Sequence, residues 1–115
     1  MKHIRIWSAL VAALLALQAP VVLANPVWTN AAPVTHIEAV QDGTFLVYTS
    51  ASVSSNCVTA SGGLYFQVGA NTVTSDGIKT LLTLAMSALV SGKTVQVLYD
   101  DTAPTCYAKF IQINQ

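Results

Sequence analysis

Two short motifs, Gly92-Lys93-Thr94 and Asp100-Asp101, have residue types that could do chemistry. The first resembles the end of the phosphate-binding loop G-x-x-x-x-G-K-[ST], but Ser87 stands where that motif needs its first glycine. The surrounding pattern also predicts a helix before the motif and a strand after it, which is the reverse of a phosphate loop. We therefore interpret Gly92-Lys93-Thr94 as the end of a helix and the beginning of a strand.

The adjacent aspartates make a poor metal or acid–base site. Neighbouring side chains at a strand end point in opposite directions, so Asp100 and Asp101 cannot easily act together. Calcium would need several more oxygen ligands at loop spacing, and general acid–base work would need a second carboxylate close by. We expect a solvated turn here, with a weak ligand contact as the alternative. The sequence predicts no metal site, no cofactor and no catalytic residue.

The first 24 residues have the pattern of a secretory signal peptide. A basic start precedes an apolar run over residues 6–17, and the sequence VLA at residues 22–24 suits a signal peptidase. An uncleaved membrane anchor is the alternative, but the run is shorter than the roughly 20 apolar residues of a bilayer span. We expect cleavage after Ala24 and export to the periplasm or beyond, without stable membrane insertion.

Removal of residues 1–24 would leave one small domain of about 90 residues. Lys2 and Arg5 would leave with the signal peptide, so three lysines would face five acidic residues, for a net charge of −2. Three lysines cannot form a basic face, which argues against nucleic acid as a partner.

Export would place Cys57 and Cys106 in an oxidising compartment, where a disulfide between them is expected. This bond would close a loop of about 50 residues and contribute on the order of 4 kcal/mol to stability. The alternative is two free thiols, one of them nucleophilic. A nucleophilic thiol needs a base, and His36 stands alone on a strand-like stretch. We expect a chain that is not an enzyme.

The elements that position these residues follow from hydrophobic periodicity. Strands are predicted over residues 34–40, 44–50, 64–68, 94–99 and 105–114. One amphipathic helix is predicted between the third and fourth strands, with apolar residues at Ile78, Leu81, Leu82, Ala85, Met86 and Leu89.

Ser75 is expected to cap the start of the helix and Gly92 to end it. Residues 25–33 are interpreted as a proline-bounded leader before a domain over residues 34–115. The order βββαββ predicts a β-rich α+β fold, a five-stranded Greek-key barrel of the OB type. A half-open α+β sandwich is the alternative.

Several aromatic residues of this domain must be exposed. In pairs such as Tyr65-Phe66, one ring lies on each side of a strand. Exposed tyrosines among serine, threonine and asparagine suit sugars or a subunit interface. The aromatic residues after the predicted signal peptide, from which the exposed ones come, are Trp28, Phe45, Tyr48, Tyr65, Phe66, Tyr99, Tyr107 and Phe110.

The segment DGIKTLLTLAMSALVSGKTVQVLYDD, between GGLYFQVG and CYAKFIQI, resembles part of a known family. It is similar to the helix-to-strand region of the OB-fold B subunits of AB5 toxins, especially the subtilase cytotoxin B subunit and its pertussis-like relatives. The chain also resembles small exported proteobacterial proteins without an assigned role. The matching positions are Ser91, Gly92, Lys93, Val95, Val97 and Tyr99.

The resemblance implies a non-catalytic, glycan-binding domain that assembles into a ring. The chain departs from the family in two ways. The family's main disulfide is local to the early strands, and Asn30-Ala31-Ala32-Pro33 stands where a sialic-acid-binding serine is expected. No ligand-contact residue is therefore transferred from the family.

Two functions remain open from the sequence. The first is an exported binding module similar to a toxin B subunit, which would bind a glycan and form a homo-oligomer. The alternative is a standalone periplasmic protein with a structural or partner-binding role.

Overall fold

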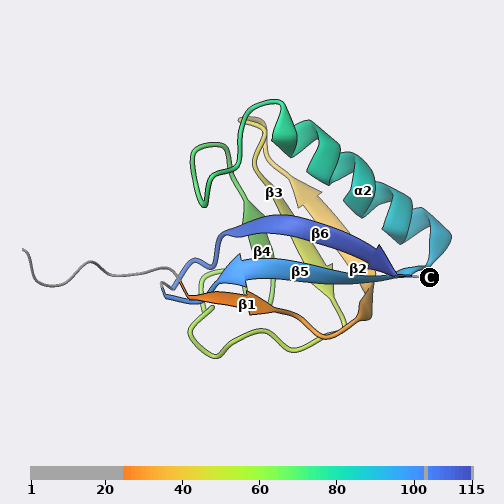
Figure 1. Ribbon diagram of the computed structural model, residues 1–115, viewed down its shortest axis with the longest axis horizontal. Coiled ribbons are helices and arrows are strands. Elements are labelled where there is room, and N and C mark those ends of the chain that lie inside the picture. Colours follow the sequence, from red (N-terminus) through yellow and green to blue (C-terminus); the bar gives the residue numbers. More distant parts are fainter. Residues whose placement is uncertain (1–24, 103, 115) are drawn as a thin grey trace, which may run out of the picture.

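The computed structural model describes residues 25–102 and 104–114, so the predicted signal peptide lies outside the described residues. They form a small, strand-rich domain in which a curled antiparallel sheet makes a half-barrel and one helix lies against it (Figure 1). The elements are β1 (Pro26–Trp28), β2 (Ala32–Ala39), β3 (Phe45–Thr49), β4 (Leu64–Phe66), α2 (Gly77–Ser91), β5 (Thr94–Asp100) and β6 (Ala108–Asn114).

The sheet is organised around β5. One edge of β5 pairs with β6, and the other pairs first with β1 and then, further along, with β2. Between β1 and β2, the buried Thr29 keeps the contact with β5: its N–H donates to the Val97 carbonyl, and its Oγ1 accepts from the Val97 N–H. From β2 the sheet continues through β3 to β4.

The N-terminal segment differs from the expectation. Residues 25–33, interpreted as a leader before the domain, contain β1 and the first residues of β2. With β1 counted, α2 follows the fourth strand, so the predicted position of the helix between strands three and four is wrong. A three-residue strand that begins with proline has no alternation to detect, and its pairing with β5 joins residues 70 to 74 positions apart.

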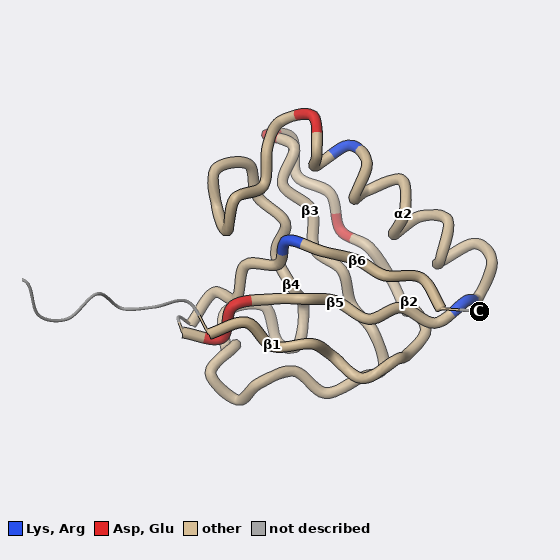
Figure 2. Tube along the Cα trace, in the orientation of Figure 1, with Lys and Arg blue, Asp and Glu red and all other residues tan. Residues whose placement is uncertain are grey.

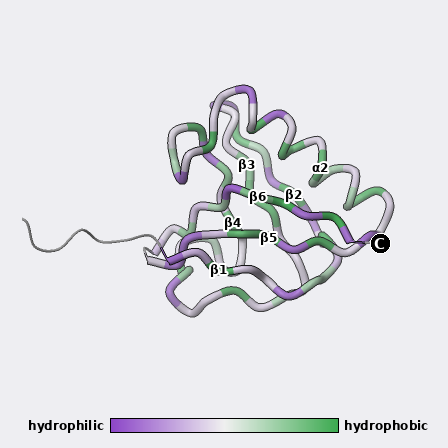
Figure 3. The backbone as a smooth tube through the Cα atoms, in the orientation of Figure 1, coloured by the Kyte–Doolittle hydropathy of each residue, from purple (hydrophilic) through white to green (hydrophobic). Residues whose placement is uncertain are grey.

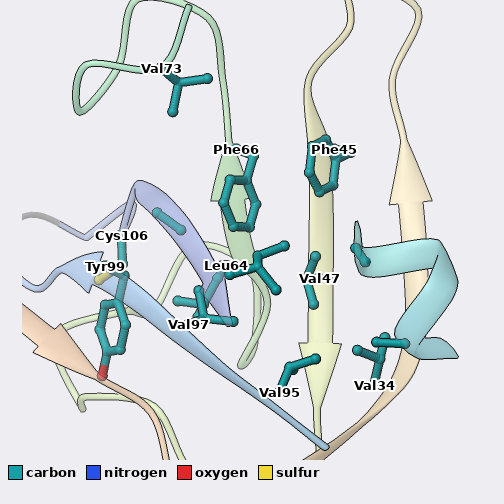
Figure 4. Packing of buried hydrophobic residues seen from close by; sticks show 14 of the residues in the cluster. Val34, Phe45, Val47, Leu64, Phe66, Val73, Val95, Val97, Tyr99 and Cys106 are labelled. Atoms are coloured by element: carbon teal, nitrogen blue, oxygen red, sulfur yellow. The ribbon is translucent and has the colours of Figure 1, made fainter. Parts of the chain in front are cut away.

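The hydrophobic core lies on the concave side of the sheet (Figure 4). Phe45 of β3 and Phe66 of β4 are opposite each other in the register, and their rings stack with centroids 4.7 Å apart. Tyr65, between two buried neighbours, lies on the other side of β4, as the Tyr65-Phe66 pair predicts. The other large, fully buried side chains are Leu64, Val47, Val95, Val97 and Cys106.

Helix α2 packs on β2 and β6 through small residues. Ala85 and Ala88 are fully buried, and Ile78 is buried near the helix start. Hydrophobic residues recur along the whole helix (Figure 3), yet Met86 and Leu89 are 53% and 40% exposed, so their predicted burial is wrong. Alanines allow the helix backbone to approach the sheet closely, which turns these two larger side chains toward solvent.

The predicted C-terminal end of α2 is confirmed, but its predicted N-terminal cap is wrong. Gly92 ends the helix as predicted, with φ of 70° and its N–H donating to the Ala88 carbonyl. At the start, Ser75 is not the cap: Thr74 Oγ1 accepts a 2.9 Å hydrogen bond from the Gly77 N–H instead. Nothing among the described helices has the length and hydropathy that crossing a membrane requires.

The disulfide between Cys57 and Cys106 is confirmed, and it fixes the long loop between β3 and β4 to the segment before β6. The same loop is held by a 2.8 Å hydrogen bond from the Ser54 N–H to the Tyr99 hydroxyl. Val58 and Thr59 N–H groups both donate to the Pro104 carbonyl. A loop without regular structure thus gains a defined path across one end of the half-barrel.

Candidate functional site

An open cluster of polar and aromatic side chains lies on the outer face of β2, β3 and β4. The strand register places His36 opposite Tyr48 and aligns Glu38, Leu46 and Tyr65 across the three strands. Alternate residues of a strand share one face, so these five side chains lie together, away from the core. We call His36, Glu38, Tyr48 and Tyr65 the aromatic face.

A β-bulge in β2 brings His36 to this face. Val34 is buried, and strict alternation would bury His36 as well, but the register shifts between these two residues. The extra residue, Thr35, reverses which side chains point outward, and its Oγ1 donates a 3.1 Å hydrogen bond to the Tyr48 carbonyl. After the bulge, His36 and Glu38 point outward and Ile37 packs against the core.

The Tyr48 ring has two close neighbours. It stacks on the His36 imidazole, with ring centroids 4.0 Å apart and planes 11° from parallel. Its other contact is Gly63: a Cβ on that glycine would lie only 2.6 Å from the Tyr48 Cζ. The absence of a side chain at position 63 therefore allows the ring to lie against the backbone at the end of the long loop.

Glu38 dominates the electrostatics of this face. Its Oε1 lies 3.7 Å from His36 Nε2, and both side chains are more than half exposed. Burial raises the pKa of Tyr48, and the negative charge of Glu38 raises it further. The phenol is thus neutral through physiological pH and keeps its proton as a hydrogen-bond donor.

The aromatic face is the floor of a shallow depression of about 520 Å³. Thr59 and Ser61 from the long loop contribute hydroxyl groups to its rim. Among the described residues that line it, Glu38 is the one with a full charge at neutral pH, and neither lysine nor arginine is present. The arrangement offers a flat ring, a carboxylate and hydroxyl groups to a ligand from solvent.

The predicted chemistry residues lie elsewhere. Asp100 and Asp101 are at the end of β5 beside the start of β1 (Figure 2), on a different part of the sheet from the aromatic face. Gly92 and Lys93 form the turn from α2 to β5, as interpreted from the sequence. Within residues 25–102 and 104–114, no group of three or more histidine, cysteine, aspartate or glutamate side chains could hold a metal ion.

Two members of the aromatic face were missed as site residues. His36 was considered only as a catalytic base, and Tyr48 only as one of several exposed aromatics. The two residues are 12 positions apart, and only the bulge and the register bring their rings together. The one local signal was the interrupted alternation between Val34 and Glu38, which is what a bulge produces.

Comparisons with known proteins add no relative. No family model matches this chain, and no curated protein or solved structure is significantly similar to it.

Proposed function

We propose that this chain is an exported, non-catalytic binding module whose aromatic face binds a carbohydrate. The observation that carries the proposal is the Tyr48 ring, stacked on His36, supported by Gly63 and open to a depression with a carboxylate. The stacked pair is preorganised, so the ring surface that it leaves exposed, including that of the His36 imidazole, can contact the apolar face of a sugar at low entropic cost. Carboxylate and hydroxyl groups then accept hydrogen bonds from sugar hydroxyls.

The strand connections support an OB-type barrel for this module. β2 pairs with β3 and β5, β5 pairs with β6, and a parallel bridge between Tyr65 and Tyr107 links β4 to the segment before β6. OB folds bind oligosaccharides and oligonucleotides on the face of their second and third strands. With β1 taken as an addition to the edge, β3 and β4 hold those positions, and both contribute to the aromatic face.

The charge of the face favours a neutral sugar. Glu38 would repel the carboxylate of an acidic sugar, and the described lining provides no lysine or arginine to offset it. A neutral hexose or N-acetylhexosamine can instead donate hydroxyl or amide hydrogens to Glu38. The resemblance to toxin B subunits supports glycan binding in general. The Glu38 carboxylate adds that the bound glycan should have no negative charge.

A glycan array followed by NMR titration tests the proposal. We expect binding of neutral oligosaccharides, with chemical-shift changes centred on His36, Tyr48 and Tyr65. Tyr48→Ala should weaken binding at least tenfold, about 1.4 kcal/mol. Phe110→Ala is the matched control, because Phe110 is an exposed ring, 53% accessible, on β6. Absence of glycan binding, or equal loss in both variants, would contradict the proposal.

A second function, docking of a protein partner or of further copies of the chain, is favoured by a different observation. Val90 on α2 is 85% exposed, and Met86 beside it is 53% exposed. Trp28 and Phe110 form another exposed pair, with ring centroids 5.9 Å apart. Multi-angle light scattering of wild type and Val90→Glu would test this. If wild type is an oligomer and the variant is a monomer, docking of further copies through α2 is favoured.

A further inference from the structure

Asn25 is held at the end of β5 by hydrogen bonds from its backbone and from its side-chain amide. Its backbone N–H donates a 3.1 Å hydrogen bond to Asp100 Oδ1, and its side-chain Nδ2 donates a 2.6 Å hydrogen bond to Asp101 Oδ1. The Asn25 carbonyl accepts from the Asp101 N–H at 3.2 Å. Three hydrogen bonds thus fix the first described residue against two adjacent carboxylates.

The two carboxylates are themselves positioned by neutral groups. Asp100 Oδ1 also accepts from the Thr102 N–H at 3.0 Å and from Thr102 Oγ1 at 2.7 Å. Asn56 Nδ2, from the long loop, donates to the Asp101 carbonyl at 3.1 Å. We call Asn25, Asn56, Asp100, Asp101 and Thr102 the N-terminal clamp.

The clamp has negative charge without a cation. Burial opposes ionisation of Asp100, but hydrogen bonds from Thr102 and Asn25 outweigh it and lower its pKa. In the described part of the chain the one ion pair is that of His36 with Glu38, so no lysine neutralises Asp100 or Asp101. Asp100 therefore presents a fixed negative charge directly to the Asn25 nitrogen.

That nitrogen is the one that signal-peptide removal would release. When water hydrolyses the Ala24–Asn25 peptide bond, the Ala24 carbonyl carbon takes the hydroxyl group and becomes a carboxylate. The Asn25 nitrogen gains the other proton of water and the proton lost by the new acid, so one amide N–H becomes an ammonium group. We propose that Asp100 binds the α-ammonium group of the mature chain while Asp101 holds the Asn25 side chain, an inference that rests on the predicted cleavage after Ala24.

The site has a definite pH dependence. An α-amino group has an ordinary pKa of about 7.7–8.0, and the neighbouring carboxylates raise it in the folded chain. Asp100 and Asp101 are the titratable side chains that face Asn25, and Asn56 and Thr102 beside them are neutral. The ion pair therefore stabilises the fold fully between the ordinary Asp100 pKa of 3.8 and about pH 7.7. The stabilisation disappears as pH rises through the raised pKa of the α-amino group, and it is also lost in acid when Asp100 is protonated.

The test uses the chain exported and processed by a bacterial host. Mass spectrometry should find Asn25 as the first residue, and NMR titration should find an α-amino pKa above the ordinary range. Selective acetylation of this amine should lower the thermal midpoint at pH 7 by about 2–5 °C. The difference should vanish at a pH above the raised pKa.

Variants separate this ion pair from general destabilisation. In Asp100→Asn, acetylation should have little further effect, whereas in Asp76→Asn, a carboxylate at the start of α2, it should act as in wild type. If Asp100→Asn does not fold, the α-amino pKa of the wild-type chain, measured by NMR, decides alone. The inference is overturned if the mature chain begins at another residue. It is equally overturned if the α-amino pKa is ordinary and acetylation leaves the midpoint unchanged.

Discussion

The aromatic face and the N-terminal clamp both place a carboxylate beside other polar groups, yet they differ in how those groups are used. In the clamp, Asp100 Oδ1 accepts three hydrogen bonds within 3.1 Å from the chain itself. On the aromatic face, His36 Nε2 lies 3.7 Å from Glu38 Oε1, and the glutamate side chain is 57% exposed. The clamp's hydrogen-bonding capacity is largely satisfied by the fold, whereas that of the aromatic face remains accessible from solvent.

This difference distinguishes structural from ligand-binding polar groups. A carboxylate that already accepts several hydrogen bonds from the chain stabilises the fold, but it has few free acceptor sites for a ligand. A carboxylate next to a rigid ring, in a depression with hydroxyl groups, retains acceptor sites that a ligand can use. Changes at the clamp and in the loop attached to it should therefore alter stability, and changes at the aromatic face should alter binding.

The largest effect on stability is expected from loss of the disulfide. Cys57 and Cys106 are 49 positions apart, and their bond fixes the loop that also contributes Asn56 to the clamp. Replacing both cysteines with alanine should lower the free energy of unfolding by about 4 kcal/mol, as measured by urea denaturation. A reducing agent should have a similar effect on wild type and none on the variant. An unchanged free energy of unfolding would show that the loop is held without the bond.

Gly63→Val should disrupt the aromatic face while leaving the clamp intact. The added Cβ would lie 2.6 Å from the Tyr48 Cζ, so the ring must leave its stack on His36. We expect a stability loss of roughly 1–3 kcal/mol from overpacking and loss of the ring-current shifts of His36 in NMR spectra. In a Tyr48→Ala background the same substitution should cost much less. Equal costs in the two backgrounds would contradict the close approach.

The sequence predicted the elements that have a strong local period. The pattern from Ile78 to Leu82 indicated the helix, Gly92 its end, and the alternation of residues 94–99 the strand β5. The Cys57–Cys106 disulfide was predicted from two cysteines in a chain expected to be exported. These features depend on local propensity or on composition, which a single sequence contains.

The features that were missed depend on pairing between distant residues. β1 has three residues and owes its existence to β5. The aromatic face depends on a one-residue bulge at Thr35, which changes the side of the sheet for every residue after it. Asp100 and Asp101 were predicted as a solvated turn after the strand, whereas Asp100 is the last residue of β5. Their contacts with Asn25 join residues about 75 positions apart, beyond any local pattern.

Acid should weaken the clamp more than the aromatic face. The pKa of Asp100 is lowered from its ordinary value of 3.8, so its contribution is present above that pH and is lost as pH falls through the lower folded value. Asp100→Asn should destabilise the protein at neutral pH by about 1 kcal/mol. It should also make the free energy of unfolding fall less steeply as the pH is lowered, which is the acid limb of the stability curve. Asp76→Asn is the matched control. An acid limb unchanged by Asp100→Asn would show that other groups cause it.

The smallest effect on stability, and the clearest on binding, is expected from His36→Ala. The imidazole is 54% exposed, so its stacking on Tyr48 contributes only about 0.5 kcal/mol. Without it the Tyr48 ring loses the neighbour that keeps it flat, so glycan affinity should fall while the unfolding midpoint barely moves. His36→Phe restores a stacking partner without a charge and should recover most of the affinity if stacking is the role of His36. If only a histidine supports binding, the imidazole nitrogens contact the ligand directly, and the role of the face changes from a stacked platform to a hydrogen-bonding site.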